Sequence, residues 1–148
     1  MTGAVKNKEN SWYYEGNIVE VLPEDCVGFV YLITNNTTGR KYIGKKLAKF
    51  AKTTYKVVKL KNGTKKKKKI RSKVDSDWQE YYGSNDVLNE DVGKIGKDNF
   101  TREILRYCKS KTELSYYESK YQFDCDVLLD ESIWYNGWIS VKVRRFKL

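Results

Sequence analysis

The sequence contains no histidine, a single proline and only three cysteines, Cys26, Cys108 and Cys125. Without histidine the protein cannot form a Ser-His triad, a Cys-His pair or a His-ligated zinc site. The cysteines are odd in number and far apart, which argues against a disulfide framework or a structural zinc site, so we expect three small buried thiols. Any enzymatic site must therefore use Tyr, Lys, Asp or Glu, and any metal must be a hard cation on oxygen ligands, magnesium above all.

Long apolar segments are also missing. No run approaches the roughly 20 apolar residues of a membrane-spanning helix, and the first residues lack the apolar stretch of a signal peptide. We therefore expect a cytoplasmic protein with no membrane partner. The 148 residues suffice for one domain, and contents of 40% hydrophobic and 14% aromatic residues suffice for a core.

Acidic side chains are absent from one long segment. Residues 45–73 hold 14 Lys and Arg and no Asp or Glu, whereas the rest of the chain holds 15 basic and 19 acidic residues. A concentrated basic segment on a near-neutral body is typical of a protein that binds a polyanion, with an affinity that falls as salt rises. The alternative is a solvated, disordered run of lysines.

The order within this segment favours a β-ribbon over a disordered run. Residues 54–61 are β-prone, Asn62-Gly63 is a strong hairpin-turn signal, and residues 64–74 would form the second strand of the hairpin. The sequence therefore predicts a protruding basic hairpin at about 53–74 that lies in a groove of DNA or along its backbone. The side chains expected to contact phosphates, without reading bases, are Lys45, Lys49, Lys65, Lys66, Lys67, Lys68, Lys69 and Arg71.

The rest of the chain alternates strand and helix signals. Strands are expected at 17–22, 28–34, 41 onwards and 100–108. Helical signals fall at 47–52, at 76–82, from Ser84 or Asn85 to Gly96, and from Ser110 to about Phe123. Residues 138–148 form either a basic tail or an edge strand. We predict an α+β fold in which helices flank a small, mainly antiparallel three-stranded sheet.

Glu118 is the most informative single residue. In the helix that starts at Ser110, Leu114, Tyr117 and Tyr121 share one stripe, and Glu118 occupies the same stripe. A carboxylate that faces a core must be paired, hydrogen-bonded or bound to a metal. Glu118 is therefore either a functional residue or a structural residue that reaches the rim or pairs with a lysine.

Tyr31 and Tyr42 each lie in a predicted strand, eleven residues apart across a hairpin. Tyrosines in strands are usually cross-strand packing residues. Gly44 follows Tyr42 closely, and a glycine within a strand indicates a bulge or the close approach of a ligand to the backbone. Lys45 and Lys46 then place positive charge beside that glycine.

Together these residues resemble the signature of the GIY-YIG nucleases. Phe29-Val30-Tyr31 stands in place of Gly-Ile-Tyr, and Tyr42-Ile43-Gly44 is intact. The downstream segments that are similar to phage-type members are Tyr82-Gly83-Ser84, 96–100, Ile104-Leu105, the helix with Glu118, and Tyr135-Asn136. The resemblance spans about residues 27–137. An N-terminal extension (1–26) precedes this domain and a basic segment (138–148) follows it.

The resemblance implies a metal-dependent DNA endonuclease of the phage or homing-endonuclease type, acting in the cytoplasm of an infected bacterium. It would hydrolyse phosphodiester bonds by nicking or by double-strand cutting, with Glu118 binding one Mg²⁺ or Mn²⁺ ion at the scissile phosphate. Tyr31 or Tyr42 would assist deprotonation of the attacking water. Gly44 would leave room for the backbone to approach, and Asn136 would support the site by hydrogen bonding.

The chain departs from the family pattern in its basic residues. Members carry an arginine in the helix after the second motif and a histidine nearby or downstream. Here Lys52 stands at the usual offset, with Lys45, Lys46 and Lys49 close by. Lysine neutralises developing phosphorane charge as a point charge but cannot clamp it bidentately. Lys46 and Lys52 are the two candidates for the catalytic role of the arginine.

Three functions stay open at this point. The first is the endonuclease. The second is a catalytically weak or inactive domain of the same fold that binds DNA or protein, and the third is an RNA-binding accessory protein. Because no second recognition domain is evident, any sequence specificity would come from the ribbon, the tails or a homodimer partner.

Overall fold

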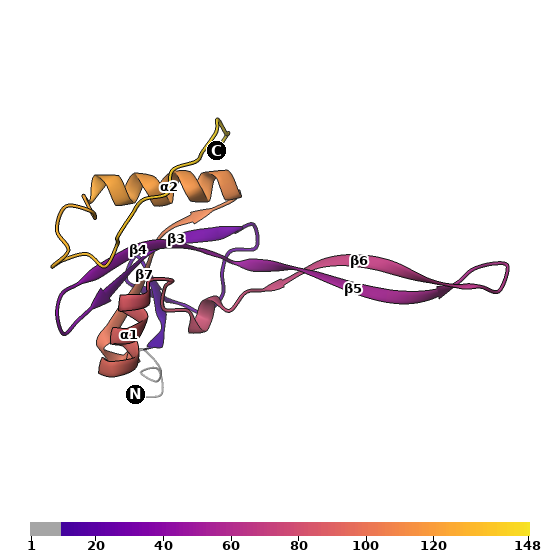
Figure 1. Ribbon diagram of the computed structural model, residues 1–148, viewed down its shortest axis with the longest axis horizontal. Coiled ribbons are helices and arrows are strands. Elements are labelled where there is room, and N and C mark those ends of the chain that lie inside the picture. The colour runs from indigo at the N-terminus through magenta and orange to yellow at the C-terminus, as the bar shows by residue number, and fades with distance from the viewer. Residues whose placement is uncertain (1–9) are drawn as a thin grey trace.

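A five-stranded mixed sheet forms the centre of the fold (Figure 1). The computed structural model describes residues 10–148. In the order β2-β1-β7-β3-β4, the strands are Asn17–Val19, Trp12–Tyr14, Phe100–Cys108, Gly28–Asn35 and Lys41–Leu47. The predicted α+β class is confirmed, but the predicted three-stranded antiparallel sheet is only the β7-β3-β4 part. The remaining two strands add a parallel pairing between β1 and β7.

Strand β1 was not predicted from the sequence, and β2 is shorter than the predicted strand at 17–22. Trp12 of β1 is buried, and its indole N–H donates a hydrogen bond to the carbonyl of Trp78. Glu15 and Gly16 both have positive φ and form the turn to β2. A strand of three residues is too short to show alternation in the sequence, so only its tertiary contacts reveal it.

The two helices cover opposite faces of the sheet (Figure 1). On one face, α1 (Asp86–Ile95) packs Leu88 and Val92 into a cluster with Tyr31. On the other face, α2 (Lys111–Asp124) packs Leu114 into a second cluster with Val30. The alternation of β3 side chains between the two clusters follows from the period of two in a strand.

Both helices begin where the sequence predicts. The side chain of Asn85 accepts a hydrogen bond from the amide of Leu88, which settles the choice between Ser84 and Asn85 as the cap of α1. Ser110 accepts in the same way from the amide of Glu113 at the start of α2. The predicted helical turn at 76–82 is a short 3₁₀ helix, Trp78–Glu80.

The basic hairpin is confirmed as an ordered two-stranded ribbon that extends far from the body of the protein (Figure 1). Strands β5 (Lys49–Lys59) and β6 (Lys65–Asp75) pair along their whole length. The amide of Leu60 bonds the carbonyl of Thr64, and Gly63 between them has a φ of 87°. The turn is therefore a three-residue loop with a left-handed glycine, one residue longer than predicted.

The predicted helix at 47–52 is wrong. Lys49 pairs with Asp75 and Phe50 with Val74 at the base of the ribbon. The hydrogen bonds to β6 outweigh the weak local helix signal, because tertiary pairing overrides intrinsic propensity in a short segment.

Of the two alternatives predicted for residues 138–148, the structure shows the tail and no edge strand, because the backbone groups of Ile43 on β4 bond to the side chain of Asn136. The expectation of three buried thiols is only partly met. Cys26 and Cys108 are buried thiols as expected, but Cys125 is exposed at the end of α2. Within residues 10–148, no helix has both the length and the apolar character needed to span a membrane.

Candidate active site and nucleic-acid interface

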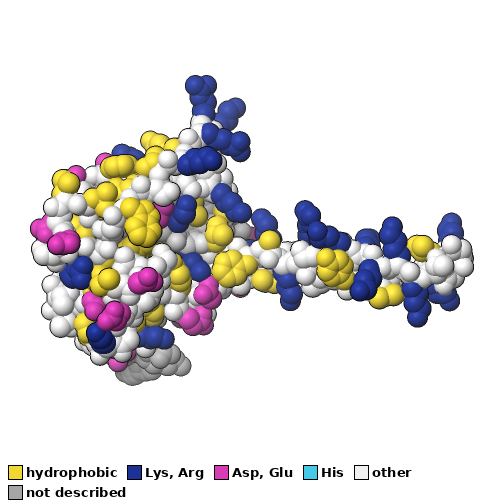
Figure 2. All heavy atoms as spheres, in the orientation of Figure 1, with side chains coloured by type: hydrophobic (Ala, Val, Ile, Leu, Met, Phe, Trp, Pro, Cys, Tyr) yellow, Lys and Arg dark blue, Asp and Glu magenta, His cyan; other side chains and the backbone are white. Residues whose placement is uncertain are grey.

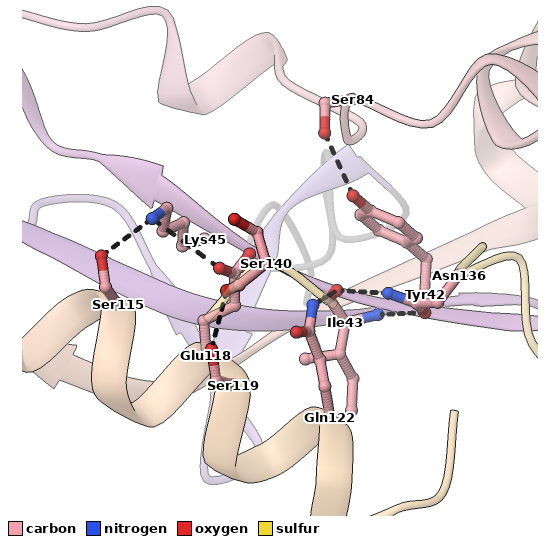
Figure 3. Close-up of polar contacts among 10 residues, drawn as sticks. All are labelled: Tyr42, Ile43, Lys45, Ser84, Ser115, Glu118, Ser119, Gln122, Asn136 and Ser140. Carbon is pink, nitrogen blue, oxygen red and sulfur yellow. Dashed lines mark hydrogen bonds and ion pairs between the residues drawn. The ribbon is translucent and has the colours of Figure 1, made fainter. Parts of the chain in front are cut away.

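A pocket of about 310 Å³ lies at the outer edge of β4. It is bounded by β4, the start of α1, one side of α2 and the C-terminal segment, which are far apart in the sequence (Figure 3). Its lining residues are Tyr42, Lys45, Ser84, Asn85, Glu118, Gln122, Asn136, Gly137, Trp138 and Ser140. The structure thus brings Tyr42, Glu118 and Asn136 of the predicted catalytic set together with Lys45 of the predicted DNA-binding set.

Glu118 points into this pocket from α2, and its side chain is 15% exposed. Burial raises the pKa of Glu118, and the nearby Lys45 acts in the opposite direction without cancelling the shift. The ammonium of Lys45 lies 3.8 Å from the carboxylate and donates a hydrogen bond of 2.9 Å to the hydroxyl of Ser115. Glu118 is therefore a half-buried carboxylate whose charge is only partly compensated, which favours binding of a further cation.

The donor set of the pocket suits a hard cation that keeps water or phosphate ligands. Within the described residues, no cluster of three or more Asp, Glu, Cys or His side chains could hold a metal, and Glu118 is the single carboxylate that lines the pocket. Gln122, one helical turn after Glu118, has a buried amide oxygen that no described residue hydrogen-bonds. Magnesium is commonly bound through one or two carboxylates, with waters and substrate phosphates as its remaining ligands. One carboxylate and one amide oxygen therefore fit a magnesium ion of this kind, and they do not suffice for an ion held by protein ligands alone.

The two tyrosines of the sequence motif have different environments. The hydroxyl of Tyr42 lies 3.1 Å from the hydroxyl of Ser84 at the pocket. Tyr31 is completely buried, and its hydroxyl donates to that of Tyr81 at 3.3 Å. Burial raises the pKa of Tyr42 and raises that of Tyr31 well above its usual value. Both hydroxyls are therefore protonated at neutral pH and act as hydrogen-bond donors, and only Tyr42 can donate into the pocket.

Gly44 makes room for these tyrosines. It pairs with Tyr31 across β3 and β4, and a Cβ atom at position 44 would lie 2.5 Å from the Tyr31 hydroxyl and 2.8 Å from Cε2 of Tyr42. The sequence suggested that Gly44 leaves space for a ligand, but the two aromatic rings occupy that space.

Asn136 fixes the edge of β4 at the pocket. Its amide oxygen accepts from the amide of Ile43 at 3.1 Å, and its amide nitrogen donates to the carbonyl of Ile43 at 2.9 Å. Gln122 donates to the same carbonyl at 2.9 Å (Figure 3). The side chain of Asn136 thus makes the hydrogen bonds that a neighbouring strand would make with Ile43. These bonds fix the β4 backbone that carries Tyr42 and Lys45.

Lys46 and Lys52, the two lysines predicted to take the role of the arginine, lie outside the pocket, as does Lys49. Lys46 is nearly buried, forms an ion pair with Asp77, and has its ammonium 4.1 Å from the ring centroid of Tyr81. Lys49 and Lys52 lie exposed on the ribbon. Lys45 is the only lysine or arginine among the residues that line the described pocket.

Six of the lining residues were not predicted as site residues from the sequence: Ser84, Asn85, Gln122, Gly137, Trp138 and Ser140. Gln122 lies four positions after Glu118, so helical spacing alone would have placed it on the same side of α2. Ser84 ends the segment Tyr82-Gly83-Ser84 and Trp138 lies two residues after Asn136, but nothing in their local sequence indicates that they meet. Their convergence depends on the packing of α1 and the C-terminal segment against β4.

The ribbon forms a second basic surface with charge on both faces (Figure 2). Because opposed residues of a hairpin share a face, Lys65, Lys67, Lys69 and Arg71 lie on one face, and Lys66 and Lys68 lie on the other. Eleven residues per strand give a length of roughly 36 Å, close to one turn of B-DNA. Tyr55 and Val57 are exposed between the lysines of the first face.

Comparison with known proteins agrees with this arrangement. Neither a curated protein nor a solved structure gave a significant match. One family does match, over residues 12–139, and its description reads "Putative endonuclease segE, GIY-YIG domain". This match covers the sheet, both helices, the ribbon and every residue of the pocket but Ser140. The chain belongs to the SegE-type GIY-YIG endonuclease domain family.

Proposed function

We propose that this protein is a divalent-metal-dependent DNA endonuclease whose active site is the pocket at the edge of β4. The observation that carries the proposal is the half-buried Glu118 carboxylate, which shares this pocket with Tyr42 and Lys45 and whose pKa is raised despite the adjacent lysine. Raised carboxylate pKa values in a concave polar site are typical of functional groups.

Three of the lining side chains have roles that their contacts support. A magnesium or manganese ion on Glu118 would supply electrophilic stabilisation of charge on the scissile phosphate. Lys45 provides a point charge for the non-bridging phosphate oxygens, in place of the arginine that family members carry. Tyr42 keeps its proton and donates a hydrogen bond that positions the attacking water or a phosphate oxygen.

The ribbon would hold the substrate. Its lysines are exposed over a length of about one helical turn of DNA, which suits binding of the phosphate backbone without sequence preference. Since residues 10–148 place Glu118 in one such pocket, a single bound chain would nick one strand. A double-strand cut would require a second binding event or a second copy of the chain.

Cleavage of supercoiled plasmid with magnesium, and its loss with EDTA, tests the proposal. Glu118→Gln keeps the size of the side chain but removes the charge that binds a hard cation, so cleavage should fall by roughly a thousandfold or more. Glu103→Gln, an exposed residue of β7, is the matched control and should cleave normally. A Glu118→Gln protein that is folded and fully active would refute the assignment.

One observation favours a second candidate, a DNA-binding module without cleavage. Lys45 already lies 3.8 Å from Glu118 and supplies part of the positive charge that a metal would bring. In that case the wild-type protein would bind DNA through the ribbon, leave plasmid intact at every magnesium concentration, and lose stability when Glu118 is replaced.

A further inference from the structure

Trp138 is the most exposed tryptophan of the molecule, and it lies at the candidate active site. Its side chain is 76% exposed, whereas Trp12 and Trp78 are buried in the core. It lines the same pocket as Tyr42 and Glu118. No described residue contacts its ring by aromatic or cation–π packing or accepts a hydrogen bond from its indole N–H. A large aromatic surface is thus presented to solvent beside the reactive groups.

The backbone on each side of Trp138 is fixed. Two residues earlier, Asn136 makes two hydrogen bonds to the backbone of Ile43. Two residues later, the carbonyl of Ser140 accepts a hydrogen bond of 3.1 Å from the hydroxyl of Ser119 on α2. Ile139 between them packs against the core cluster of the α2 face. Trp138 is therefore held in position without being covered, which lowers the entropic cost of binding a ligand on its face.

The charges around Trp138 favour a nucleic acid over an apolar partner. Lys45 lines its pocket, and a neighbouring depression is lined by Lys111, Lys142 and Arg144. Ser115 lines that depression and hydrogen-bonds Lys45, so the two sites adjoin. Residues 132–148 contain four basic side chains and no acidic ones, and basic side chains gather at the C-terminal end in Figure 2. A phosphate backbone that crosses these cations would bring a base to the indole.

We infer that Trp138 is a stacking platform for one nucleobase of the DNA. This base is displaced from the DNA helix beside the scissile phosphate and stacks on the indole ring. This inference rests on the proposed function, because it places the displaced base next to the pocket of Glu118. Indole stacks on any base, so the contact would add affinity without sequence preference. A base that is unpaired, mismatched or next to a nick costs less to displace, so DNA with such a defect would be the preferred substrate.

A binding experiment on a cleavage-incompetent background tests the inference. In the Glu118→Gln protein, Trp138→Ala should weaken binding to a short paired duplex by about tenfold. Trp138→Phe, which keeps an aromatic face, should lose much less. Leu129→Ala is the matched control, since Leu129 is 79% exposed and lies outside the pocket lining. Circular dichroism melts establish that each variant is folded.

The substrate series decides whether the contact is with a base. Each duplex carries one nick at a fixed position, which sets the register of binding because a base next to it is easier to displace, and one abasic site is moved relative to the nick, one nucleotide per substrate. At the stacking position the base is already missing, so the effect of Trp138→Ala should disappear there and persist elsewhere. An equal loss at every position, or no loss on any substrate, would overturn the inference. A change from dimer to monomer by sedimentation would also overturn it, since Trp138 would then belong to a protein interface. Because the assay measures binding, its failure is separate from a failure of the wild-type protein to cleave.

Discussion

Gly44 faces Tyr31 across β3 and β4 so closely that a Cβ atom at position 44 would lie 2.5 Å from the tyrosine hydroxyl and 2.7 Å from its ring carbon Cζ. Tyr31 is fully buried and cannot move outward. The glycine and the first tyrosine of the sequence motif are therefore one packing unit, which sets the position of β4 and of Tyr42 beside it.

Gly44→Ala should destabilise the protein by about 1–3 kcal/mol, because the new methyl group overpacks a rigid site. For a chain of this size the melting temperature should fall by roughly 2–4 °C per kcal/mol. Adding Tyr31→Phe removes the closest atom and should recover part of the loss. Gly93→Ala is the control: nothing lies within 4 Å of a Cβ there, and alanine in helix α1 should stabilise by about 0.5–1 kcal/mol.

Tyr42→Phe and Tyr31→Phe should separate catalysis from packing. The Tyr42 hydroxyl lies at the pocket, so its removal should slow single-turnover cleavage by roughly a hundredfold with little change in melting temperature. The Tyr31 hydroxyl bonds Tyr81, so its removal should cost about 1 kcal/mol of stability and leave the cleavage rate nearly unchanged. Slow cleavage by Tyr31→Phe with normal cleavage by Tyr42→Phe would instead make Tyr31 the hydrogen-bond donor of the active site.

Lys45→Met and Lys52→Met are a matched pair for the role of the family arginine. Lys45 lines the pocket, so its loss should reduce the cleavage rate by roughly 10²–10³ while DNA affinity changes little. Lys52 lies exposed on the ribbon, so its loss should weaken DNA binding slightly and spare the rate at saturating DNA. Equal effects of the two variants on the rate would mean that neither lysine replaces the arginine.

The stability of the metal-free protein should depend on the ionisation of Glu118. Because burial raises the pKa of Glu118 in the folded state, the folded protein binds this proton more tightly than the unfolded chain does. The favourable contribution is present below the usual pKa of 4.5 and is lost as the pH rises through the raised folded value. Glu118→Gln should therefore melt higher than the wild type at neutral pH, and the difference should vanish in acid.

Magnesium provides the complementary measurement on Glu118. It should raise the melting temperature of the wild-type protein at neutral pH but not that of Glu118→Gln, since only a carboxylate binds the ion. A variant that melts lower than the wild type at neutral pH would instead make the ion pair with Lys45 the main role of Glu118.

The two faces of the ribbon can be tested separately. Lys65, Lys67 and Lys69 lie on one face, and Lys66 and Lys68 on the other. If the ribbon lies in a groove between two phosphate backbones, replacing either set with Ser should weaken DNA binding and lower the salt slope by at most about 0.9 per lysine. Melting temperatures should hardly change, because exposed lysines contribute little to stability. A response from one set alone would show that the ribbon lies flat on one backbone.

Local patterns in the sequence were sufficient for most elements of the fold. The apolar run of β3, the Ser110 and Asn85 caps, and the ribbon are each specified by neighbouring residues, and the structure confirms them, although the turn of the ribbon is one residue longer than predicted. The errors fall where the decisive partner is remote. Trp12 lies in a strand because β1 pairs with β7 and its indole hydrogen-bonds the carbonyl of Trp78. Residues 49–52 form a strand because β6 pairs with them.

The residues of the candidate site likewise fall into those recognisable in the sequence and those that only tertiary packing brings to the pocket. The spacing of Tyr42 and Gly44, the polar Glu118 on an apolar stripe, and Tyr135-Asn136 were recognisable in the sequence alone, because each is a local pattern or a familiar motif. Only the tertiary structure placed Lys45, Gln122 and Trp138 around Glu118 and removed Lys46 and Lys52 from the pocket. The sequence determined which side chains were available for this chemistry. Long-range packing of β4, α2 and the C-terminal segment decided which of them meet, because contacts between residues 42, 118 and 138 have no counterpart in any local stretch of the chain.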